Sequence, residues 1–351
     1  MKFSKTHLET VSREFLMAVG ASSSEAETVA RSLVQADMRG IHTHGVNFLP
    51  KIAMRIADGV MTIPTEPKVI SDRDAICHID GNNGFGQIAA VKGMQCAIEH
   101  ASQFGVGMTF IRNTNHIGLL AQYSTVAAEN GMIGFAMCNS APSVAPWGGM
   151  EPFFGTNPFS VAAPSGEEHP VVLDMSTTVV ARGKIRQALK NGNQIPEDWA
   201  FGSDGRPTSD PKEAMKGTLV PIGGAKGYGM AFFIDLICGL LPGSNFSREV
   251  LTFHKSEGPT GVGAMMCAID IQRLMPLNTF QILVKSHVQS IRDSKKAEGN
   301  MRIYLPGEIE AYAEQASQAD GIDIDEKTVA EIDSILEEKG VELRLKQQIP
   351  R

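Results

Sequence analysis

The chain has few of the features that mark several common classes of protein. Its 351 residues include only 5 cysteines, which are far apart and form no Cys-x-x-Cys pair. Each lies in an apolar run, as Cys138 does, so we expect buried free thiols rather than disulfides or a zinc site. The longest apolar run, 230–241, contains Asp235 and is too short to cross a bilayer. The N-terminal residues form no signal-peptide core, and together these features predict a cytoplasmic protein.

An excess of positive charge is also lacking. The 32 Lys and Arg residues are outnumbered by 39 Asp and Glu residues, which gives a net charge of -7. The basic residues are scattered rather than clustered. Because nucleic acids and anionic membranes select a basic face, we expect neither as a partner and expect a small-molecule ligand instead. The length and the hydrophobic content of 42% suit a globular protein with one large domain or two.

Two common nucleotide-binding motifs are missing. No Gly-x-Gly-x-x-Gly follows a strand-like run, and no Gly-x-x-x-x-Gly-Lys-Ser/Thr loop occurs. Both motifs place backbone N–H groups around phosphates. A standard Rossmann domain is therefore disfavoured.

The first seventy residues have helical periodicity. Thr6-x-x-Glu9 and Ser24-x-x-Glu27 fit the capping box, so we expect two helices to begin there. A third helix is expected from about Leu49 to Gly59. Pro64 and Pro67 follow it and indicate a domain junction.

From about residue 68, apolar runs of strand length alternate with helical segments. This order predicts an α/β (α+β) domain with a mixed sheet. Two acidic helices after residue 308 are expected to pack on the N-terminal helices. We therefore divide the chain into a helical part at 1–70, a central α/β domain at 71–308 and C-terminal helices at 309–351. The predicted strands are 75–79, 106–111, 132–138, 171–173 and 262–271, and the helices within and after them are 86–103, 119–130, 227–241, 309–319 and 326–339.

A histidine follows one of these strands in the loop Asn113-Thr114-Asn115-His116-Ile117-Gly118. In α/β enzymes a strand-to-helix junction holds catalytic side chains in a fixed but open place. Histidine also exchanges protons near neutral pH. His116 is therefore a candidate acid–base residue. The alternative is a histidine that only caps the following helix.

Two segments are candidate ligand sites. The glycine-rich turn 223–229 opens into a helix and contains Lys226. Free N–H groups and an ammonium group suit a pyrophosphate, although a plain turn with a solvated lysine is the alternative. A buried strand at 170–173 ends in Asp174 followed by hydroxyl residues, where ligands gather in open sheets. Spacing alone favours a helix N-cap at this second place.

His42 and His44 are two residues apart and are a third candidate. With His116 they would supply three imidazoles to a metal. However, no carboxylate stands at ligand spacing and no His-Glu-x-x-His occurs. The simpler interpretation places one of the two histidines in the site and the other on the opposite face.

Taken together, these motifs resemble those of the malate/L-lactate dehydrogenase family, which is unrelated to the Rossmann-type malate and lactate dehydrogenases. The resemblance extends from about residue 36 to residue 307. Six motifs in order, at the family's spacing, make it highly specific. The motifs are Arg39-Gly40-x-x-Thr43-His44-Gly45, Asn115-His116-x-Gly118, Gly155-Thr156-Asn157-Pro158, Asp174-Met175-Ser176, Gly224-x-Lys226-Gly227 and Leu305-Pro306-Gly307-Glu308.

The resemblance implies a helical domain formed by both chain ends, a central domain with a non-Rossmann nicotinamide site, and a homodimer. It implies hydride transfer between nicotinamide and a small 2-hydroxy or 2-oxo acid of the malate or L-lactate type. His116 would take the hydroxyl proton, and His44 would orient the substrate oxygen or share the proton. The implied cofactor contacts are Ser140, Asp174, Met175, Ser176, Lys226, Pro306, Gly307 and Glu308.

Two substitutions depart from the family pattern. Phe48 stands where family members commonly have an arginine that grips the substrate carboxylate, and Lys51 is the nearest cation. A lysine point charge does not replace a bidentate arginine. Thr43 stands where the family usually has serine. We expect Lys51 and Thr156 to contact the substrate.

The cofactor and the substrate stay open at this stage. NAD is favoured because no arginine cluster for a 2′-phosphate is evident, while Lys184 and Arg186 keep NADP open. Ureidoglycolate dehydrogenase and cyclic-imine carboxylate reductase, both of the same family, are alternatives. A metal-dependent hydrolase or lyase that uses His42, His44 and His116 is a further one, and so is a non-catalytic nucleotide sensor.

Overall fold

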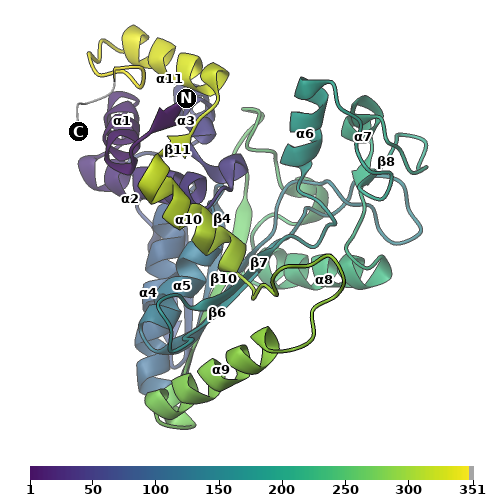
Figure 1. The fold of residues 1–351 in the computed structure, drawn as a ribbon. Coiled ribbons are helices and arrows are strands. Elements are labelled where there is room, and N and C mark those ends of the chain that lie inside the picture. The colour runs from purple at the N-terminus through teal and green to yellow at the C-terminus, as the bar shows by residue number, and fades with distance from the viewer. Residues whose placement is uncertain (348–351) are drawn as a thin grey trace.

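The computed structural model describes residues 1–347, and a seven-stranded sheet forms its centre (Figure 1). The strand order is β2-β3-β4-β10-β5-β6-β7. β3 and β4 are parallel, and the other neighbours are antiparallel, which confirms the predicted mixed sheet. The strands are β2 (Lys68–Arg73), β3 (Ile76–Asp80), β4 (Val106–Thr114), β5 (Met132–Cys138), β6 (Phe159–Ala163), β7 (Val171–Met175) and β10 (Val262–Asp270).

The central strand β10 is apolar along its length because both of its faces are covered. Ala264, Met266 and Ala268 point to one side, while Met265 and Cys267 point to the other. Alternate residues of a strand face opposite sides, so a strand buried on both sides needs a continuous apolar run. Helices α4 (Gly86–Phe104) and α5 (Ala121–Glu129) cover the first side, and α8 (Ala225–Asp235) with the π-helical turn η3 (Leu236–Leu240) covers the second.

Both ends of the chain form one helical layer, as predicted. Leu8 and Leu33 share a hydrophobic core with Ile332 and Leu336. A short antiparallel pair joins the two ends, because Phe3 pairs with Ile322. The elements are β1 (Lys2–Phe3), α1 (Lys5–Ala18), α2 (Ser23–Met38), α3 (Leu49–Ala57), α10 (Glu308–Asp320), β11 (Ile322–Asp323) and α11 (Glu326–Glu338).

The starts of the first two helices differ from the prediction by two residues. Helix α1 is capped by Ser4 rather than Thr6. Helix α2 has its capping box at Ser22 and Glu25, not at Ser24. For α2, both Ser22 with Glu25 and Ser24 with Glu27 fit the capping pattern. Tertiary structure selects the earlier pair, because the Glu25 carboxylate also accepts a hydrogen bond from the Thr65 amide.

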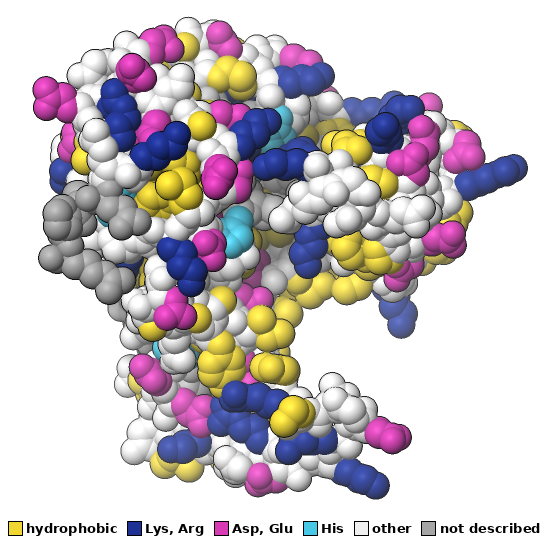
Figure 2. Space-filling view, turned by 45° about the horizontal axis from the view of Figure 1, so that its top comes forward, with side chains coloured by type: hydrophobic (Ala, Val, Ile, Leu, Met, Phe, Trp, Pro, Cys, Tyr) yellow, Lys and Arg dark blue, Asp and Glu magenta, His cyan; other side chains and the backbone are white. Residues whose placement is uncertain are grey.

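A lobe and an arm both project from the sheet toward the right of Figure 1, the lobe above and the arm below. The lobe has a small core of its own, which includes Ile185, Ala214 and Leu219. Figure 2 shows a hollow between the lobe and the arm. The lobe contains α6 (Arg182–Asn191), β8 (Ala200–Phe201), α7 (Pro211–Lys216) and β9 (Thr218–Leu219), and the arm is α9 (Leu277–Arg292).

The five cysteines are free thiols, as predicted, and Cys96 is the one among them that is not fully buried. Within residues 1–347, no helix has the length and apolar character needed to span a membrane.

Candidate functional site

The short turn between α2 and α3 carries His44. It consists of two 3-10 segments, η1 (His42–His44) and η2 (Val46–Phe48). The buried Asp37 carboxylate accepts a hydrogen bond from the Val46 amide at 2.7 Å and contacts Nδ1 of His42 at 2.9 Å. A Cβ at position 45 would lie 2.1 Å from this carboxylate, so glycine is required there. Asp37 thereby holds His42 on the outside of the turn and leaves His44 on the inside.

His116 follows β4 directly, in a loop fixed by buried polar contacts. The Asn115 side-chain amide donates to the carbonyl of Gly84 at 2.9 Å. The Thr260 hydroxyl donates to the carbonyl of Thr114 at 2.9 Å. As a result the ring centroids of His116 and His44 are 5.2 Å apart. The structure therefore brings together the two histidines that the motifs predicted.

Aromatic rings surround this imidazole pair. Phe48 stacks on His116 with ring centroids 4.3 Å apart, and Phe253 lies 5.9 Å from the same ring. Burial lowers the pKa of His44 to about 4. Burial, with His44 as a further cause, lowers the pKa of His116 well below 6.5. Both rings are therefore neutral at pH 7.

Hydrogen bonds restrict the tautomers of the pair. The Gly118 amide donates to Nδ1 of His116 at 3.2 Å, which favours the tautomer that carries its proton on Nε2. Nδ1 of His44 lies 2.9 Å from the Thr43 hydroxyl, which either donates to it or accepts from it. His44 can therefore present an unprotonated Nε2, which His116 does not in this tautomer.

Lys51, the predicted substrate contact, lies beside the pair. Its Nζ is 4.6 Å from the centroid of the Phe48 ring and donates to the carbonyl of Asn47 at 3.1 Å. Burial lowers the pKa of Lys51 to about 8, and the charge of Arg186 adds to this effect. The amine still carries its proton at pH 7.

The structure adds Phe253 and His254, which the motifs did not indicate. The ring of His254 lies 6.0 Å from that of Phe48. Arg55 holds their loop, because its buried guanidinium donates to the Lys255 and Gly258 carbonyls and lies over the Phe253 ring. These residues follow an irregular polar stretch, so sequence periodicity gives no signal for them.

The glycine-rich turn adjoins the strand end that was predicted as a second ligand site. Helix α8 begins after Gly224, which has φ 63°, and within residues 1–347 no side chain caps this end. A Cβ on Gly227 would lie 2.3 Å from the Ile222 carbonyl and 2.9 Å from the Thr177 carbonyl. Glycine therefore lets the start of α8 pack against the segment after β7. Lys226 lies exposed at this end.

Ser140 and Thr156 lie on two loops that contact the same region. The Ser140 amide donates to the side-chain oxygen of Asn157 at 3.1 Å, and the hydroxyls of Ser140 and Thr156 are 3.4 Å apart. The Asn157 amide group donates to the carbonyl of Ala231 in α8. Thr177 donates from its backbone to the Thr156 carbonyl at 2.9 Å. The loops that contain Ser140, Thr156 and Lys226 therefore form one connected frame.

Asp174 and Met175 end β7, and Asp174 connects this frame to the His116 loop. Its carboxylate accepts from the Ala121 amide, at the start of α5, at 2.8 Å. Asp174 thus caps α5, which lies earlier in the chain, whereas spacing alone had favoured a cap on a helix directly after Asp174. Burial raises the pKa of Asp174 to about 6. The Ser176 hydroxyl lies 3.0 Å from that of Thr178.

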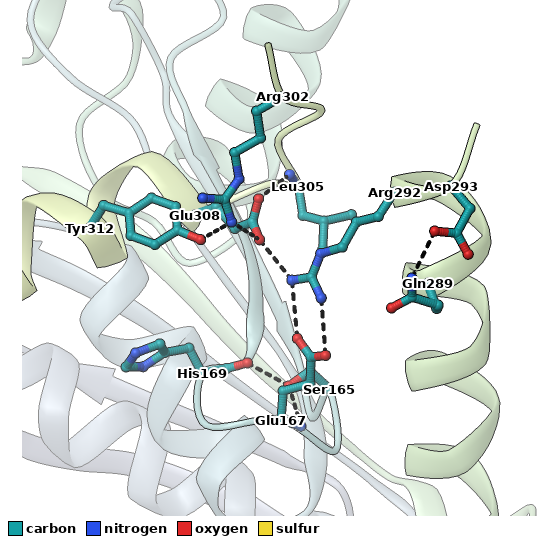
Figure 3. A network of polar contacts seen from close by, with 10 residues as sticks. All are labelled: Ser165, Glu167, His169, Gln289, Arg292, Asp293, Arg302, Leu305, Glu308 and Tyr312. Atoms are coloured by element: carbon teal, nitrogen blue, oxygen red, sulfur yellow. Dashed lines mark hydrogen bonds and ion pairs between the residues drawn. The ribbon is translucent and has the colours of Figure 1, made fainter. Parts of the chain in front are cut away.

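The segment from Leu305 to Glu308 lies along β7. The Pro306 carbonyl accepts from the Val172 amide at 3.2 Å, and Gly307 has φ 85° with its Cα packed close to Val172. Burial alone would raise the pKa of Glu308, but the Leu305 amide and Arg292 outweigh it and lower the pKa. Figure 3 shows this carboxylate facing Arg292, at 2.7 Å.

The three histidines considered as metal ligands do not converge. His42 faces Asp37, away from the other two. Across the residues that the structure describes, no group of three or more His, Cys, Asp or Glu side chains could hold a metal ion.

The structure thus has a mixed α/β fold in which two neutral histidines lie beside a lysine, and the glycine-rich start of α8 belongs to a connected frame of loops. A family model described as malate/L-lactate dehydrogenase matches residues 3–333. The chain therefore belongs to this family.

Several known proteins are similar over nearly the whole chain. Malate/(S)-sulfolactate dehydrogenase from Methanothermus fervidus is 35% identical over 94% of this chain and 96% of that protein. Ureidoglycolate dehydrogenase (NAD(+)) from Escherichia coli K12 is 33% identical over 92% of this chain and 93% of that protein. The crystal structure of malate dehydrogenase from Entamoeba histolytica has a TM-score of 0.94 at 31% identity and covers 98% of this chain and 99% of that chain.

Proposed function

We propose that the chain is an NAD(P)-dependent dehydrogenase that interconverts a small 2-hydroxy acid and its 2-oxo acid. Its relatives are dehydrogenases of such acids by name. The observation that carries the proposal is the pair formed by His44 and His116, 5.2 Å apart and neutral at pH 7. A site that moves one proton to or from an oxygen atom needs such groups.

The residues of the frame fit a nicotinamide dinucleotide. Glycines and the uncapped start of α8 offer N–H groups to a pyrophosphate, and the exposed Lys226 adds a positive charge. When bound, the nicotinamide supplies or accepts the hydride. The residues proposed to hold the dinucleotide are Ser140, Asp174, Met175, Ser176, Lys226, Pro306, Gly307 and Glu308.

Proton exchange with the substrate oxygen is assigned to the imidazole pair. If His116 takes the hydroxyl proton on Nε2, its Nδ1 must carry hydrogen and the Gly118 contact must break. In the tautomer that Gly118 favours, Nε2–H of His116 donates to the substrate oxygen and His44 takes the proton. The aromatic rings beside the pair reduce its contact with water, which strengthens both interactions.

Lys51 is proposed to bind the substrate carboxylate, with Thr156 as a second contact. Phe48 fills the place of the arginine common in the family and stacks on His116 instead. The nearby Lys51 ammonium supplies the positive charge. NAD is proposed ahead of NADP. Ureidoglycolate or a cyclic-imine carboxylate is the alternative substrate, because Phe48 changes the place where family members bind a carboxylate.

A substrate panel tests the function. The purified protein is mixed with 2-oxo acids or cyclic-imine carboxylates and with NADH or NADPH, and absorbance is followed at 340 nm. We expect reduction of at least one 2-oxo acid, faster with NADH. Turnover of cyclic imines alone would favour the alternative. NADH binding without any turnover would indicate a nucleotide sensor and contradict the proposal.

A homodimer is proposed from the uncovered apolar residues of α8, η3 and α9. Phe233 is 61% exposed, Leu240 52% and Ile282 64%. Apolar surface of this extent usually contacts a partner. Light scattering after gel filtration should give twice the 37.8 kDa of one chain. A cytoplasmic location and the domain boundaries at residues 70 and 308 stay predictions.

A further inference from the structure

We infer that Tyr123 of α5 is a positioning residue that sets the tautomer of His116. Its hydroxyl orients the peptide group between residues 117 and 118, and the N–H of this peptide group contacts the His116 ring. The inference rests on the proposed function, in which Nε2–H of His116 donates to the substrate oxygen. It adds a residue that lies outside the family motifs quoted above.

One peptide group carries both of the hydrogen bonds on which the inference depends. Its carbonyl, from Ile117, accepts from the Tyr123 hydroxyl. Its N–H, from Gly118, donates to Nδ1 of His116 at 3.2 Å. The C=O and N–H of a trans peptide group lie in one plane and point in opposite directions. The hydroxyl that fixes the carbonyl therefore also fixes the direction of the N–H.

The surroundings of Tyr123 keep its hydroxyl as a donor. The side chain is fully buried in the core between α5 and the sheet. Burial raises the pKa of Tyr123 and outweighs the Gln122 amide group, which lowers it as a donor to the hydroxyl oxygen. The same amide group lies 3.5 Å from the Ile117 carbonyl. The hydroxyl thus keeps its proton at neutral pH, and this proton is directed to the carbonyl.

The rest of the loop is held from other sides, so the peptide group before Gly118 is the part that can turn over. A Cβ on Gly86 would lie 2.5 Å from the His116 carbonyl, which shows how closely the start of α4 packs on this backbone. Gly118 has φ 77°. Glycine adopts positive and negative φ with similar ease, and the two main turn types differ by a flip of the peptide group before such a residue.

A flip of this peptide group would reverse the role of His116. The Ile117 carbonyl would then face Nδ1 in place of the Gly118 N–H. Because a carbonyl only accepts hydrogen bonds, Nδ1 would have to carry the hydrogen, and Nε2 would be left without one. His116 would no longer donate to the substrate oxygen. The Tyr123 hydroxyl stabilises the unflipped peptide group and so keeps the donor in place.

NMR spectra of the imidazole nitrogens measure the tautomer directly and need no substrate. In the unchanged protein at pH 7 we expect His116 to be protonated on Nε2 and not on Nδ1. Its signals are assigned by their loss in His116→Gln. Tyr123→Phe removes only the hydroxyl and should raise the proportion of the other tautomer by about 3–10-fold, since one neutral hydrogen bond is lost. The averaged shifts of the two ring nitrogens should then move in opposite directions.

Kinetics of the same variant should agree with the spectra. With NADH and the best 2-oxo acid of the panel, Tyr123→Phe should lower kcat by about 3–10-fold and leave the Kd for NADH unchanged. Ser124→Ala is the matched control, because it removes a buried hydroxyl of the same helix that lies 2.7 Å from the Ser160 hydroxyl. This control should keep the tautomer and kcat of the unchanged protein even where its Tm falls. Thermal unfolding shows whether each variant is folded.

Three results would overturn the inference: His116 protonated on Nδ1 in the unchanged protein, ring nitrogen shifts that do not respond to Tyr123→Phe, or an equal loss of kcat in Tyr123→Phe and Ser124→Ala. The last result would show that Tyr123 only fills the core. If the unchanged protein reduces no 2-oxo acid, the proposed function fails. The ring nitrogen shifts still decide in that case whether Tyr123 sets the tautomer.

Discussion

The imidazole pair and the start of α8, which we propose to belong to one site, have opposite physical character. His44 and His116 are half-buried among aromatic rings and held neutral, whereas Lys226 is exposed and charged beside glycines. Proton transfer requires groups that are little hydrated and fixed in position, while anion binding requires donors that a ligand can reach. Variants in the two regions should therefore separate chemistry from cofactor binding.

The largest effect is expected from His116→Ala. Loss of an acid–base residue typically lowers kcat by about 10²–10⁴-fold. Because this ring is outside the frame that contains Lys226, the Kd for NADH should change little. Steady-state kinetics and NADH fluorescence titration measure the two quantities. His169→Ala, at an exposed histidine, is the control. Near-normal kcat in His116→Ala would remove this residue from the mechanism.

Lys226→Ala should have the opposite effect to His116→Ala: weaker NADH binding with little change in kcat. The loss of one charged hydrogen bond weakens binding by about 1.5–3 kcal/mol, so the Kd for NADH should rise by about 10–100-fold. At saturating NADH, kcat should remain close to normal. Fluorescence titration of this variant beside Lys295→Ala, which lacks a different exposed lysine, makes the comparison. An unchanged Kd would show that Lys226 is a solvated turn residue.

Stability against acid should respond to His44. Its pKa is 6.5 in the unfolded chain and about 4 in the folded protein. Below pH 6.5 the unfolded chain therefore binds a proton that the folded protein excludes until about pH 4. Folding stability should fall across this range by up to about 1.4 kcal/mol per pH unit. Thermal unfolding of His44→Gln should show a smaller decrease in Tm between pH 6.5 and pH 4.

His42→Gln is the matched comparison for this effect. The hydrogen bond to Asp37 raises the pKa of His42, so its charged form stabilises the folded protein below pH 6.5 and this stability is lost as pH rises. Removal of His42 should therefore make the decrease in Tm on acidification steeper. A decrease that is equal in both variants would contradict the assignment to His44.

The smallest effect is expected from Asp174→Asn. Because burial raises the pKa of Asp174 to about 6, its ionisation costs stability as pH rises from 3.8 through 6. Asparagine keeps an oxygen for the Ala121 amide and carries no charge. The Tm of the variant at pH 8 should equal or exceed that of the unchanged protein. NADH binding should weaken a few-fold, by about the worth of one hydrogen bond. A large drop in Tm would show that the charged carboxylate is needed for the fold.

The central strands were predictable from sequence, and the edge of the sheet was not. Strand β10 is buried on both faces and reads as one apolar run, and β5 matched its predicted bounds. The outer strand β2 is largely exposed, so burial left no apolar pattern in its residues. Helix α9 has one buried residue, Val288, and for the same reason showed no apolar face.

For the candidate site, sequence motifs identified the loops but not the residues that face those loops from other parts of the chain. The paired histidines and the glycine turn sit in local motifs, and the structure brings the members of each region together. Phe253 and His254 reach the imidazole pair from a segment far along the chain, so spacing holds no record of this proximity. The sequence showed only that Phe48 replaces an arginine common in the family. Its stacking on His116 depends on how α3 meets the end of β4.

Arg292 joins α9 to two other parts of the molecule. Its guanidinium binds Glu167, in the hairpin between β6 and β7, and Glu308, at the start of α10 (Figure 3). A shift of α10 relative to the sheet must therefore either break one of these ion pairs or pull the arm along. One substitution at Arg292 would therefore remove, at the same time, an ion pair between the arm and the β6–β7 hairpin and an ion pair between the arm and α10.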